Sequence, residues 1–521
     1  ARLVQDLLDY PYGCLEQTVS SAYPLLFVDA EQAKAWGLKL ATPLTEDERR
    51  QRVARALGRL AGMQASSGAF TLWGGGSRYE AYLGAYVLGF LQDAQAAGFA
   101  PPAGLQQRAI GWLQAELAQA PNRFPALPRE LKPGQSSFKE RDLELLRDSH
   151  RRFAELAHIG YMLAREQKAP LSLLRYLHDK VRDRARSPLP LVHLAAALKL
   201  MGDGRRAAEA LDDAMRRPYG VLAQRPESVW ASEWLGDYGS RLRDLAMAYA
   251  LLHRHALPHE RREQLLEEAA EQLRERRWTS TQERMALLMA ARASGGDAAA
   301  AGRERNPGWR AQWRVGAAAQ ALEGRETLQR SVAPAELAKG VQLVNSGTQP
   351  LFVALQAAGL PTQAPTPRQD LIEFEREWLH PDGSAWDGRP LKVGETLLVN
   401  LKVRSRTPIK EGLIVDAVPA GLEIENLNLS QGALEQMLGP ALATPFAMAQ
   451  ADARIRHREY RDDRYVAAAE LGPDWVSVQY LLRVVSPGRF TVPAPMAEDM
   501  YRPELRGVGR GGPPLTVLEG P

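Results

Sequence analysis

The sequence predicts a multidomain chain in which a long helical part is followed by antiparallel β structure. At 521 residues it exceeds what one hydrophobic core organises, so two to four domains are expected. Up to about residue 325, apolar residues recur at steps of three and four, the period of a helix face. After about residue 326 they alternate with polar residues, the period of a half-buried strand.

The helical part is expected to hold roughly ten to twelve helices of ordinary length. Tyr82, Tyr86 and Phe90 mark one apolar face, and breakers such as Gly202-Asp203-Gly204 separate one helix from the next. Many short amphipathic helices joined by short loops predict stacked helical hairpins, either an open solenoid or a closed α/α toroid. We find no strict repeat motif, which disfavours the usual solenoid families.

The β part shows alternation over Leu397–Val403 and over Val476–Tyr480. Several short strands at close spacing, separated by Pro and Gly, predict an antiparallel β-sandwich. The stretch Thr362–Pro367 is expected to be a hinge, and Ser430–Gln450, rich in Ala, Leu and Met, is expected to form a helix between two strands.

Composition excludes several classes of function. The 66 basic and 62 acidic residues give a net charge of only +4 and are interleaved, which argues against nucleic-acid binding. The chain has one cysteine, so it holds no internal disulfide and no zinc site built from several thiolates. No apolar run approaches the roughly 20 residues of a membrane span.

That one cysteine, Cys14, is the strongest candidate for chemistry. Gln17 follows it by three positions, so one helical turn brings the thiol and the carboxamide side by side. Loss of ammonia between them would give an internal β-cysteinyl-γ-glutamyl thioester, an acyl group ready for an outside nucleophile. Pro11 and Gly13 favour a tight turn before the thiol.

Two neighbouring tyrosines, Tyr10 and Tyr12, could shield such an acyl group from water, which is the competing nucleophile. The alternatives are plainer. Free cysteines mostly behave as small buried hydrophobic residues, and the two tyrosines could simply pack in a core.

The segment Tyr12–Gln17 (Tyr-Gly-Cys-Leu-Glu-Gln) resembles the thioester motif of the alpha-2-macroglobulin and complement superfamily, and its Leu resembles the bacterial branch. Further resemblance is spread along the whole chain. The segments that carry it are Ser67–Trp73, Tyr238–Asp244, Trp278–Glu283, Tyr460–Tyr465 and Met500–Gly507.

This resemblance implies three domains: an α/α-toroid thioester domain at 1–325, a CUB-type β remnant with a linker at 326–366, and a terminal macroglobulin-type β-sandwich at 367–521. It implies that the chain is the C-terminal part of a larger protein whose bait region and other macroglobulin domains lie elsewhere. It also implies a periplasmic location, with a tether to the inner membrane in a segment absent from this chain.

The resemblance further implies a covalent protease trap. An amine or hydroxyl of an attacking protease would attack the acyl carbon of Gln17 and expel the Cys14 thiolate. Such a protein is a single-turnover inhibitor, not an enzyme, and it needs no cofactor beyond its own Cys–Gln cross-link. The expected partners are attacking proteases, the remaining macroglobulin domains and, as a further possibility, another envelope protein.

Histidines form the next group of candidates. His150 and His158 lie at a plausible sequence distance to assist transfer to hydroxyls, although a core or surface role is the more common one. His255 and His259 have a four-residue metal-ligand spacing, but Pro258 between them breaks the helix that would align the rings.

Other classes of function stay open. An α/α toroid can host a glycan-processing enzyme, Cys14 could be the thiol nucleophile of a protease or transglutaminase, and the chain could be an envelope interaction module without an active thioester. Five tryptophans are expected to pack in the toroid, with a sugar-binding lining as the alternative. They are Trp230, Trp234, Trp278, Trp309 and Trp313.

Overall fold

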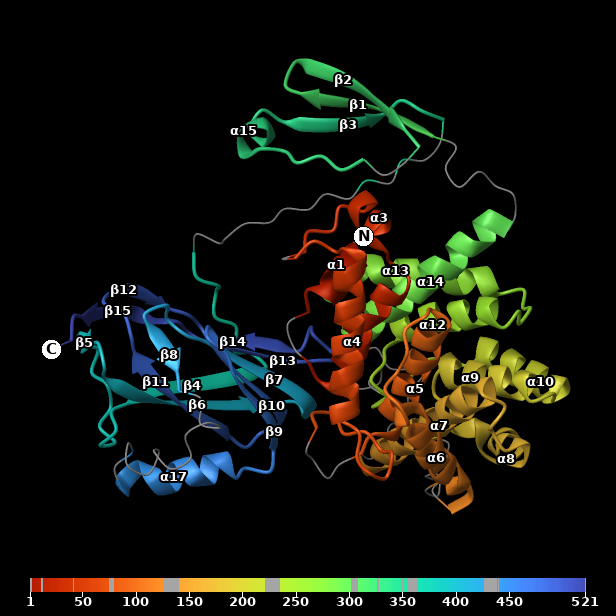
Figure 1. Ribbon diagram of the computed structural model, residues 1–521, viewed down its shortest axis with the longest axis horizontal. Helices are drawn as coiled ribbons and strands as arrows, with labels where there is room; N and C mark the ends of the chain where they lie inside the picture. Colours follow the sequence, from red (N-terminus) through yellow and green to blue (C-terminus); the bar gives the residue numbers. More distant parts are fainter. Residues whose placement is uncertain are drawn as a thin grey trace, which may run out of the picture. The chain divides into compact units, whose positions relative to one another are not determined.

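The chain divides into two compact units (Figure 1). The first consists of Ala1–Arg276 and Thr281–Leu355, and the second of Arg277–Ser280 and Gln356–Pro521. The computed structural model describes residues 2–10, 13–40, 42–74, 79–122, 124, 140–220, 235–300, 308–325, 328–348, 351, 353, 363–425, 438 and 440–520. Within these residues, no helix combines the length and the apolar character that crossing a bilayer requires.

The first unit is mainly helical. Its α-helices are α1 (Arg2–Leu8), α2 (Leu15–Ala22), α3 (Ala30–Ala35), α4 (Glu46–Gly62), α5 (Ala81–Ala96), α6 (Leu105–Ala118), α7 (Glu140–Arg165), α8 (Leu171–Val181), α9 (Pro188–Leu200), α10 (Gly204–Arg216), α12 (Arg241–Arg254), α13 (Arg262–Glu275) and α14 (Thr281–Ala300). Three short 3-10 helices follow α2, α6 and α8 in the chain: η1 (Tyr23–Leu26), η2 (Ala120–Asn122) and η3 (Arg182–Arg184).

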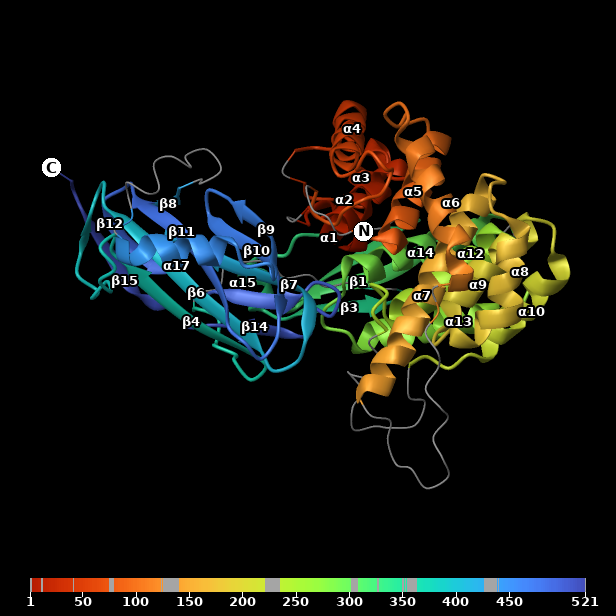
Figure 2. The same cartoon turned by 90° about the horizontal axis from the view of Figure 1, so that it is seen from below.

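These helices form a closed ring of two layers, which Figure 2 helps to follow. In the inner layer α2 packs on α5, α5 on α7, α7 on α9, α9 on α12, α12 on α14, and α14 returns to α2. The helices α1, α4, α6, α8, α10 and α13 pack outside this ring. Because the last inner helix contacts the first, the fold is a closed α/α toroid and not an open solenoid.

Hydrophobic pattern decides which layer a helix enters. Helix α5 is apolar over most of its circumference and is buried from Ala81 to Ala94, as expected for a helix with neighbours on all sides. Gly84 and Gly89 let these neighbours approach, since a Cβ at either position would meet Trp112 or Met162 at 2.8 Å. Outer helices bury one stripe only; α10 buries small and apolar residues from Ala207 to Met215 and exposes its charges.

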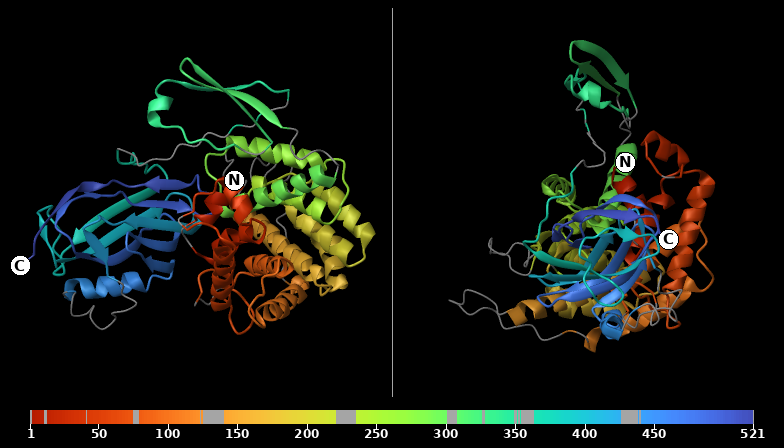
Figure 3. Two further views of the ribbon diagram at one scale, coloured as in Figure 1. Left: turned by 45° about the horizontal axis from the view of Figure 1, so that its top comes forward. Right: turned by 90° about the vertical axis from the view of Figure 1, so that its left-hand side faces the viewer.

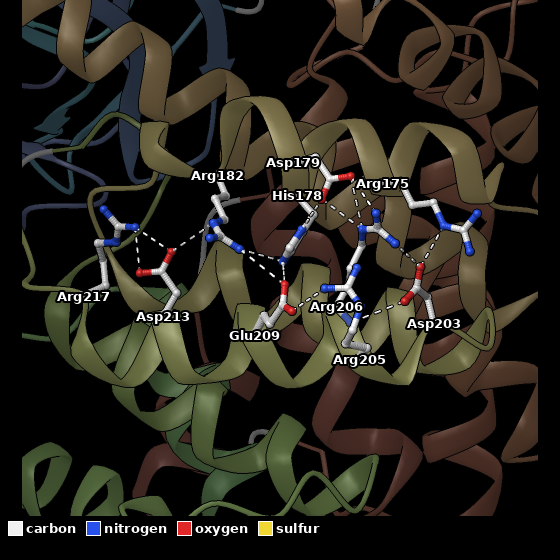
Figure 4. A network of polar contacts seen from close by, with 10 residues as sticks. All are labelled: Arg175, His178, Asp179, Arg182, Asp203, Arg205, Arg206, Glu209, Asp213 and Arg217. Atoms are coloured by element: carbon white, nitrogen blue, oxygen red, sulfur yellow. Dashed lines mark hydrogen bonds and ion pairs between the residues drawn. The ribbon is translucent and has the colours of Figure 1, made fainter.

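The exposed faces of the outer helices α8 and α10 are joined by ion pairs (Figure 4). The guanidinium of Arg206 in α10 donates hydrogen bonds to both Asp179 and Asp203. Arg205 pairs with Glu209 within α10, and its side chain is 64% exposed. Pairs of this kind contribute little each because water screens them.

A different ion cluster lies inside the toroid. The guanidinium of Arg243 is 2% exposed and donates to Asp237 at 2.8 Å, to Asp244 at 2.6 Å and to the hydroxyl of Tyr82 at 2.6 Å. Gly239 makes room for it, because a Cβ there would lie within 2.5 Å of several guanidinium atoms. This cluster gives the segment Tyr238–Asp244 its structural role: it ties α12 to α5.

A small antiparallel sheet follows the toroid, with strand order β2-β1-β3. Its strands are β1 (Trp309–Val315), β2 (Ala318–Gly324) and β3 (Val341–Asn345), and the short helix α15 (Pro334–Leu337) precedes β3. Strand structure therefore starts before the boundary predicted at residue 325. The reason is that β2 is rich in Ala, which gives only a weak strand signal.

The expectation that the five tryptophans pack in the toroid is wrong for the three that the structure describes. Trp309 and Trp313 belong to strand β1 of the small sheet. Trp278 is 40% exposed and is no core residue. Trp230 and Trp234 lie outside the described residues.

The second unit is the predicted antiparallel sandwich (Figure 3). A five-stranded sheet has the order β14-β13-β7-β10-β9, and a four-stranded sheet has the order β4-β6-β11-β8. A third sheet, β12-β15-β5, has its one parallel pair between β15 and β5. The strands are β4 (Ile372–Leu379), β5 (Leu391–Lys392), β6 (Thr396–Ser405), β7 (Ile409–Ala417), β8 (Leu422–Ile424), β9 (Ile455–Tyr460), β10 (Arg464–Leu471), β11 (Val476–Val484), β12 (Gly488–Val492), β13 (Met496–Asp499), β14 (Arg506–Val508) and β15 (Gly512–Leu518).

One core joins the sheets of the sandwich. Leu397, Val399 and Leu401 of β6 point into it with Val476 and Val478 of β11, as their alternation predicts. Helix α17 (Pro440–Gln450) follows β8 and precedes β9, and it packs on β11. A helix was expected over Ser430–Gln450, and α17 confirms it from Pro440 to Gln450. Most of the stretch before Pro440 lies outside the described residues.

The buried Arg243 cluster yields a stability prediction. Arg243→Met leaves Asp237 and Asp244 buried without their counter-charge, so we expect it to lower the free energy of unfolding of the toroid by about 3–5 kcal/mol. The matched change Arg205→Met removes an exposed pair and should cost less than about 1 kcal/mol. Urea unfolding followed by helical circular dichroism measures both, and equal losses would contradict this account of the cluster.

Candidate functional site

Cys14 is the N-cap of helix α2, and it is fully buried. Its backbone is extended, with φ −64° and ψ 172°, and its Sγ accepts a hydrogen bond from the backbone N–H of Gln17 at 3.4 Å. In return, Oε1 of Gln17 accepts from the backbone N–H of Cys14 at 3.1 Å. This is a capping box in which a thiol and a carboxamide take the usual places of a hydroxyl and a carboxylate.

Gln17 is 1% exposed, and its Nε2 donates to the hydroxyl of Tyr10 at 3.2 Å. Tyr10 is half-buried, so its ring lies beside the carboxamide while remaining in contact with solvent. The structure therefore brings three of the four predicted site residues together: Cys14, Gln17 and Tyr10. The fourth, Tyr12, lies outside the described residues.

The turn before α2 is held from two sides. The backbone N–H of Leu15 donates to the carbonyl of Leu72 at 2.7 Å, which places the segment Ser67–Trp73 against the motif. On the other side the Arg59 guanidinium lies against Gly13, where a Cβ would come within 2.7 Å of Cζ. Gly13 thus permits the close approach that its place before the cysteine suggested.

Glu16 was not singled out from the sequence, yet its carboxylate accepts hydrogen bonds from three side chains. It is fully buried in the inner layer and accepts from Ser20 of its own helix, from Thr281 Oγ1 at 2.6 Å and from Gln282 Nε2 at 2.8 Å. Thr281 and Gln282 begin helix α14. The only signal for this contact was the resemblance of Trp278–Glu283 to a late element of the superfamily.

The arrangement suits an internal acyl transfer. The thiol and the carboxamide are held on one turn by two reciprocal hydrogen bonds, so little freedom remains to be lost when they react. Cys14 lies at the N-terminus of α2, where the positive end of the helix dipole is found. Burial of both side chains excludes water, the competing nucleophile.

The histidines lie in other environments. Nδ1 of His150 accepts from the backbone N–H of Arg186 at 2.9 Å, and its Nε2 faces Asp237 at 3.4 Å. His158 stacks on the ring of His193 with centroids 4.6 Å apart. These contacts place both predicted candidates in the toroid core, as core histidines.

The predicted metal-ligand spacing does not bring its two histidines onto one ion. His255 Nε2 bonds to the Tyr161 hydroxyl at 2.7 Å, whereas His259 Nδ1 accepts from the N–H of Arg261 at 3.1 Å. In the part of the chain that the structure describes, no three His, Cys, Asp or Glu side chains gather in a way that could hold a metal.

A helical toroid with a Cys–Gln pair at the start of an inner helix, followed by β domains, defines the class: the C-terminal region of a macroglobulin-type protein. Family models agree with this order along the chain. The A-macroglobulin TED domain matches residues 1–123, the A2MG CUB domain matches 308–370, and the bacterial alpha-2-macroglobulin MG10 domain matches 372–504.

Whole-chain comparisons narrow the class. An alpha-2-macroglobulin of Xylella fastidiosa strain Temecula1 is 37% identical over 100% of this chain and 30% of its own length. The crystal structure of native Escherichia coli alpha-2-macroglobulin from domain MG7 to the C-terminus matches with a TM-score of 0.80 and 35% identity, over 99% of this chain and 75% of that chain. Salmonella alpha-2-macroglobulin reacted with methylamine matches with a TM-score of 0.78 and 32% identity, over 99% and 30%.

The chain belongs to the bacterial alpha-2-macroglobulin family. It spans about 30% of the length of the curated relatives that it matches. The activity of such a full-length protein is therefore a matter for proposal.

The burial of His158 predicts a pH dependence of stability. Burial lowers the pKa of His158 to about 3, against an ordinary value of 6.5. Between these values the unfolded chain binds a proton that the folded toroid does not, so stability is present above pH 6.5 and is lost as the pH falls. At pH 4 the loss from this residue is roughly 3 kcal/mol.

His158→Phe keeps a ring in the stack but cannot titrate. Urea unfolding of the toroid at pH 7 and at pH 4 should show a smaller acid-induced loss in this variant than in the parent chain. An equal loss in both would mean that His158 is not the residue responsible.

Proposed function

We propose that this chain is the reactive C-terminal part of a bacterial alpha-2-macroglobulin that traps attacking proteases covalently through a thioester between Cys14 and Gln17. The observation that carries the proposal is the reciprocal capping of these two buried side chains. A cysteine that only packed in a core would need no carboxamide folded back over its own backbone N–H.

Two steps account for the chemistry. In the first, the Cys14 sulfur bonds to Cδ of Gln17, the Cδ–Nε2 bond breaks, and the thiol proton leaves with the nitrogen as ammonia. In the second, a lysine amine or a hydroxyl of the protease attacks Cδ and the C–S bond breaks. The attacking group loses a proton, and the Cys14 thiolate leaves and takes up a proton to become a thiol.

A single turnover follows from this chemistry. The product is an amide or ester on Gln17, and nothing in the proposed sequence restores the thioester. The related Salmonella protein was solved after reaction with methylamine, a small amine, which supports amine chemistry in this family. The partners in this proposal are attacking proteases and the other macroglobulin domains of the full-length protein.

A glycan-processing enzyme is the less favoured candidate. Glycosidases normally need two carboxyl groups that flank the substrate. Among the residues that line the toroid cavity, Asp93 is the one carboxylate, and two arginines bind it. This leaves no acid and base pair for such a reaction at the cavity.

Location is part of the same proposal. A protease trap is useful where foreign proteases arrive, so we place the full-length protein in the periplasm, with other envelope proteins as candidate partners. Cell fractionation with periplasmic and cytoplasmic marker enzymes tests this, and recovery of the protein with the cytoplasmic marker would refute it.

The thioester itself has a direct test by mass. Intact mass of the freshly purified chain should fall short of the sequence mass by one ammonia. Methylamine should then add to Gln17 and release one titratable thiol at Cys14. Cys14→Ser and Gln17→Glu are the controls, since neither can form the thioester, and both should show the full mass and no methylamine adduct.

Full sequence mass, together with a thiol that is reactive before methylamine is added, would contradict the proposal. The same measurement on the full-length protein decides whether such a result reflects the motif itself or the loss of domains that lie outside this chain.

Tyr10 should control access to the acyl carbon. Its hydroxyl lies 3.2 Å from the Gln17 nitrogen that the thioester loses, which supports a place for its ring beside the acyl group. We expect Tyr10→Gly to raise the rate of thiol release by methylamine about tenfold, a barrier lower by about 1.4 kcal/mol. Tyr10→Phe keeps the ring and should change the rate far less; equal rates in all three proteins would exclude a shielding role.

A further inference from the structure

A cavity of about 680 Å³ lies between inner helices of the toroid. Residues from η1, α5, α7, α9, α12 and α14 line it, so six segments far apart in the sequence meet there. This volume is in the range of pockets that bind small molecules. The proposed protease trap makes no use of this cavity.

Three arginines form part of the cavity wall: Arg165, Arg254 and Arg292. Arg165 donates to Asp93 at 2.6 Å, and Arg254 donates to both oxygens of the same carboxylate at 2.5 and 3.1 Å. Burial alone would raise the pKa of Asp93, but the hydrogen bond from Arg254 and the charge of Arg165 lower it to about 2. Asp93 is therefore ionised, and it balances only one of the two arginines.

A third guanidinium adds to this imbalance. Arg292 of α14 lines the same cavity, with Cζ 3.3 Å from the centroid of the Phe27 ring. Arg292 forms no ion pair with any residue in the described ranges. Among these four lining residues, three arginines against one aspartate leave two positive charges in excess.

The other charged and titratable lining groups do not offset this excess. Arg243 lies among its own acids, Asp237 and Asp244, within the wall. Burial lowers the pKa values of His158 and His193, so their imidazoles are uncharged near neutral pH. His253 of α12 faces Glu263 at 3.9 Å.

The rest of the lining is apolar or aromatic. Methionine, which adapts its shape readily, recurs on three of the helices, and aromatic rings complete the wall. These residues are Phe27, Tyr86, Met162, Met247, Met285 and Met289.

We propose that the cavity binds a small organic anion, with its carboxylate or phosphate at Arg165, Arg254 and Arg292 and its apolar body along the methionines. Guanidinium groups suit such heads because they offer paired N–H donors in one plane. The site is independent of the thioester, so Cys14→Ser should bind the anion unchanged even if the protease-trap proposal fails.

Isothermal titration with decanoate, below its micellar concentration, tests the site. We expect saturable binding of one decanoate per chain. Each of two single variants, Arg292→Gln and Arg254→Gln, should weaken this binding at least tenfold. The uncharged 1-decanol has the same chain and should bind all three proteins weakly and alike. The exposed outer-layer change Arg205→Gln is the matched control and should leave decanoate affinity unchanged.

Three results would overturn the proposal. One is the absence of saturable decanoate binding, and another is equal affinity for decanoate and 1-decanol, which would mean an apolar cavity only. The third is full decanoate affinity in both arginine variants. Circular dichroism confirms that each variant is folded, and 1-decanol binding reports whether its cavity is intact. Inorganic phosphate in a parallel titration shows whether the head group alone is enough.

Discussion

The buried carboxylate of Glu16 is the contact on which the candidate site depends. It accepts hydrogen bonds from Ser20 in α2 and from Thr281 and Gln282 in α14, so it joins the first inner helix of the toroid to the last. A carboxyl group buried this deeply needs several hydrogen-bond partners. The residue between Cys14 and Gln17 thus also contacts the helix that closes the ring.

This constraint explains how the Cys14–Gln17 pair can be both fixed in position and kept from water. The turn that caps α2 is fixed by Glu16 behind it and by the Leu72 carbonyl beside it. Tyr10 remains the partly exposed neighbour of the carboxamide.

Much of the fold could be predicted because local pattern dictates it. The steps from Tyr82 to Phe90 predicted α5, and the alternation over Leu397–Val403 predicted β6. Trp313 was assigned to the wrong domain because the Ala-rich strand beside it has little strand character. The contact of Glu16 with Thr281 could not be predicted, since 265 residues separate them and only ring closure brings them together. The cavity could not be predicted either, because its six lining segments are far apart in the sequence and meet only in the closed ring.

The most direct test of the central claim is the bond formed with a protease. The full-length protein that contains this chain would be incubated with trypsin, and the covalent conjugate digested and sequenced by tandem mass spectrometry. The account predicts an isopeptide bond between a trypsin lysine and the Gln17 side chain, with a new free thiol at Cys14. A complex that dissociates under denaturing conditions, or attachment at a residue other than Gln17, would contradict it.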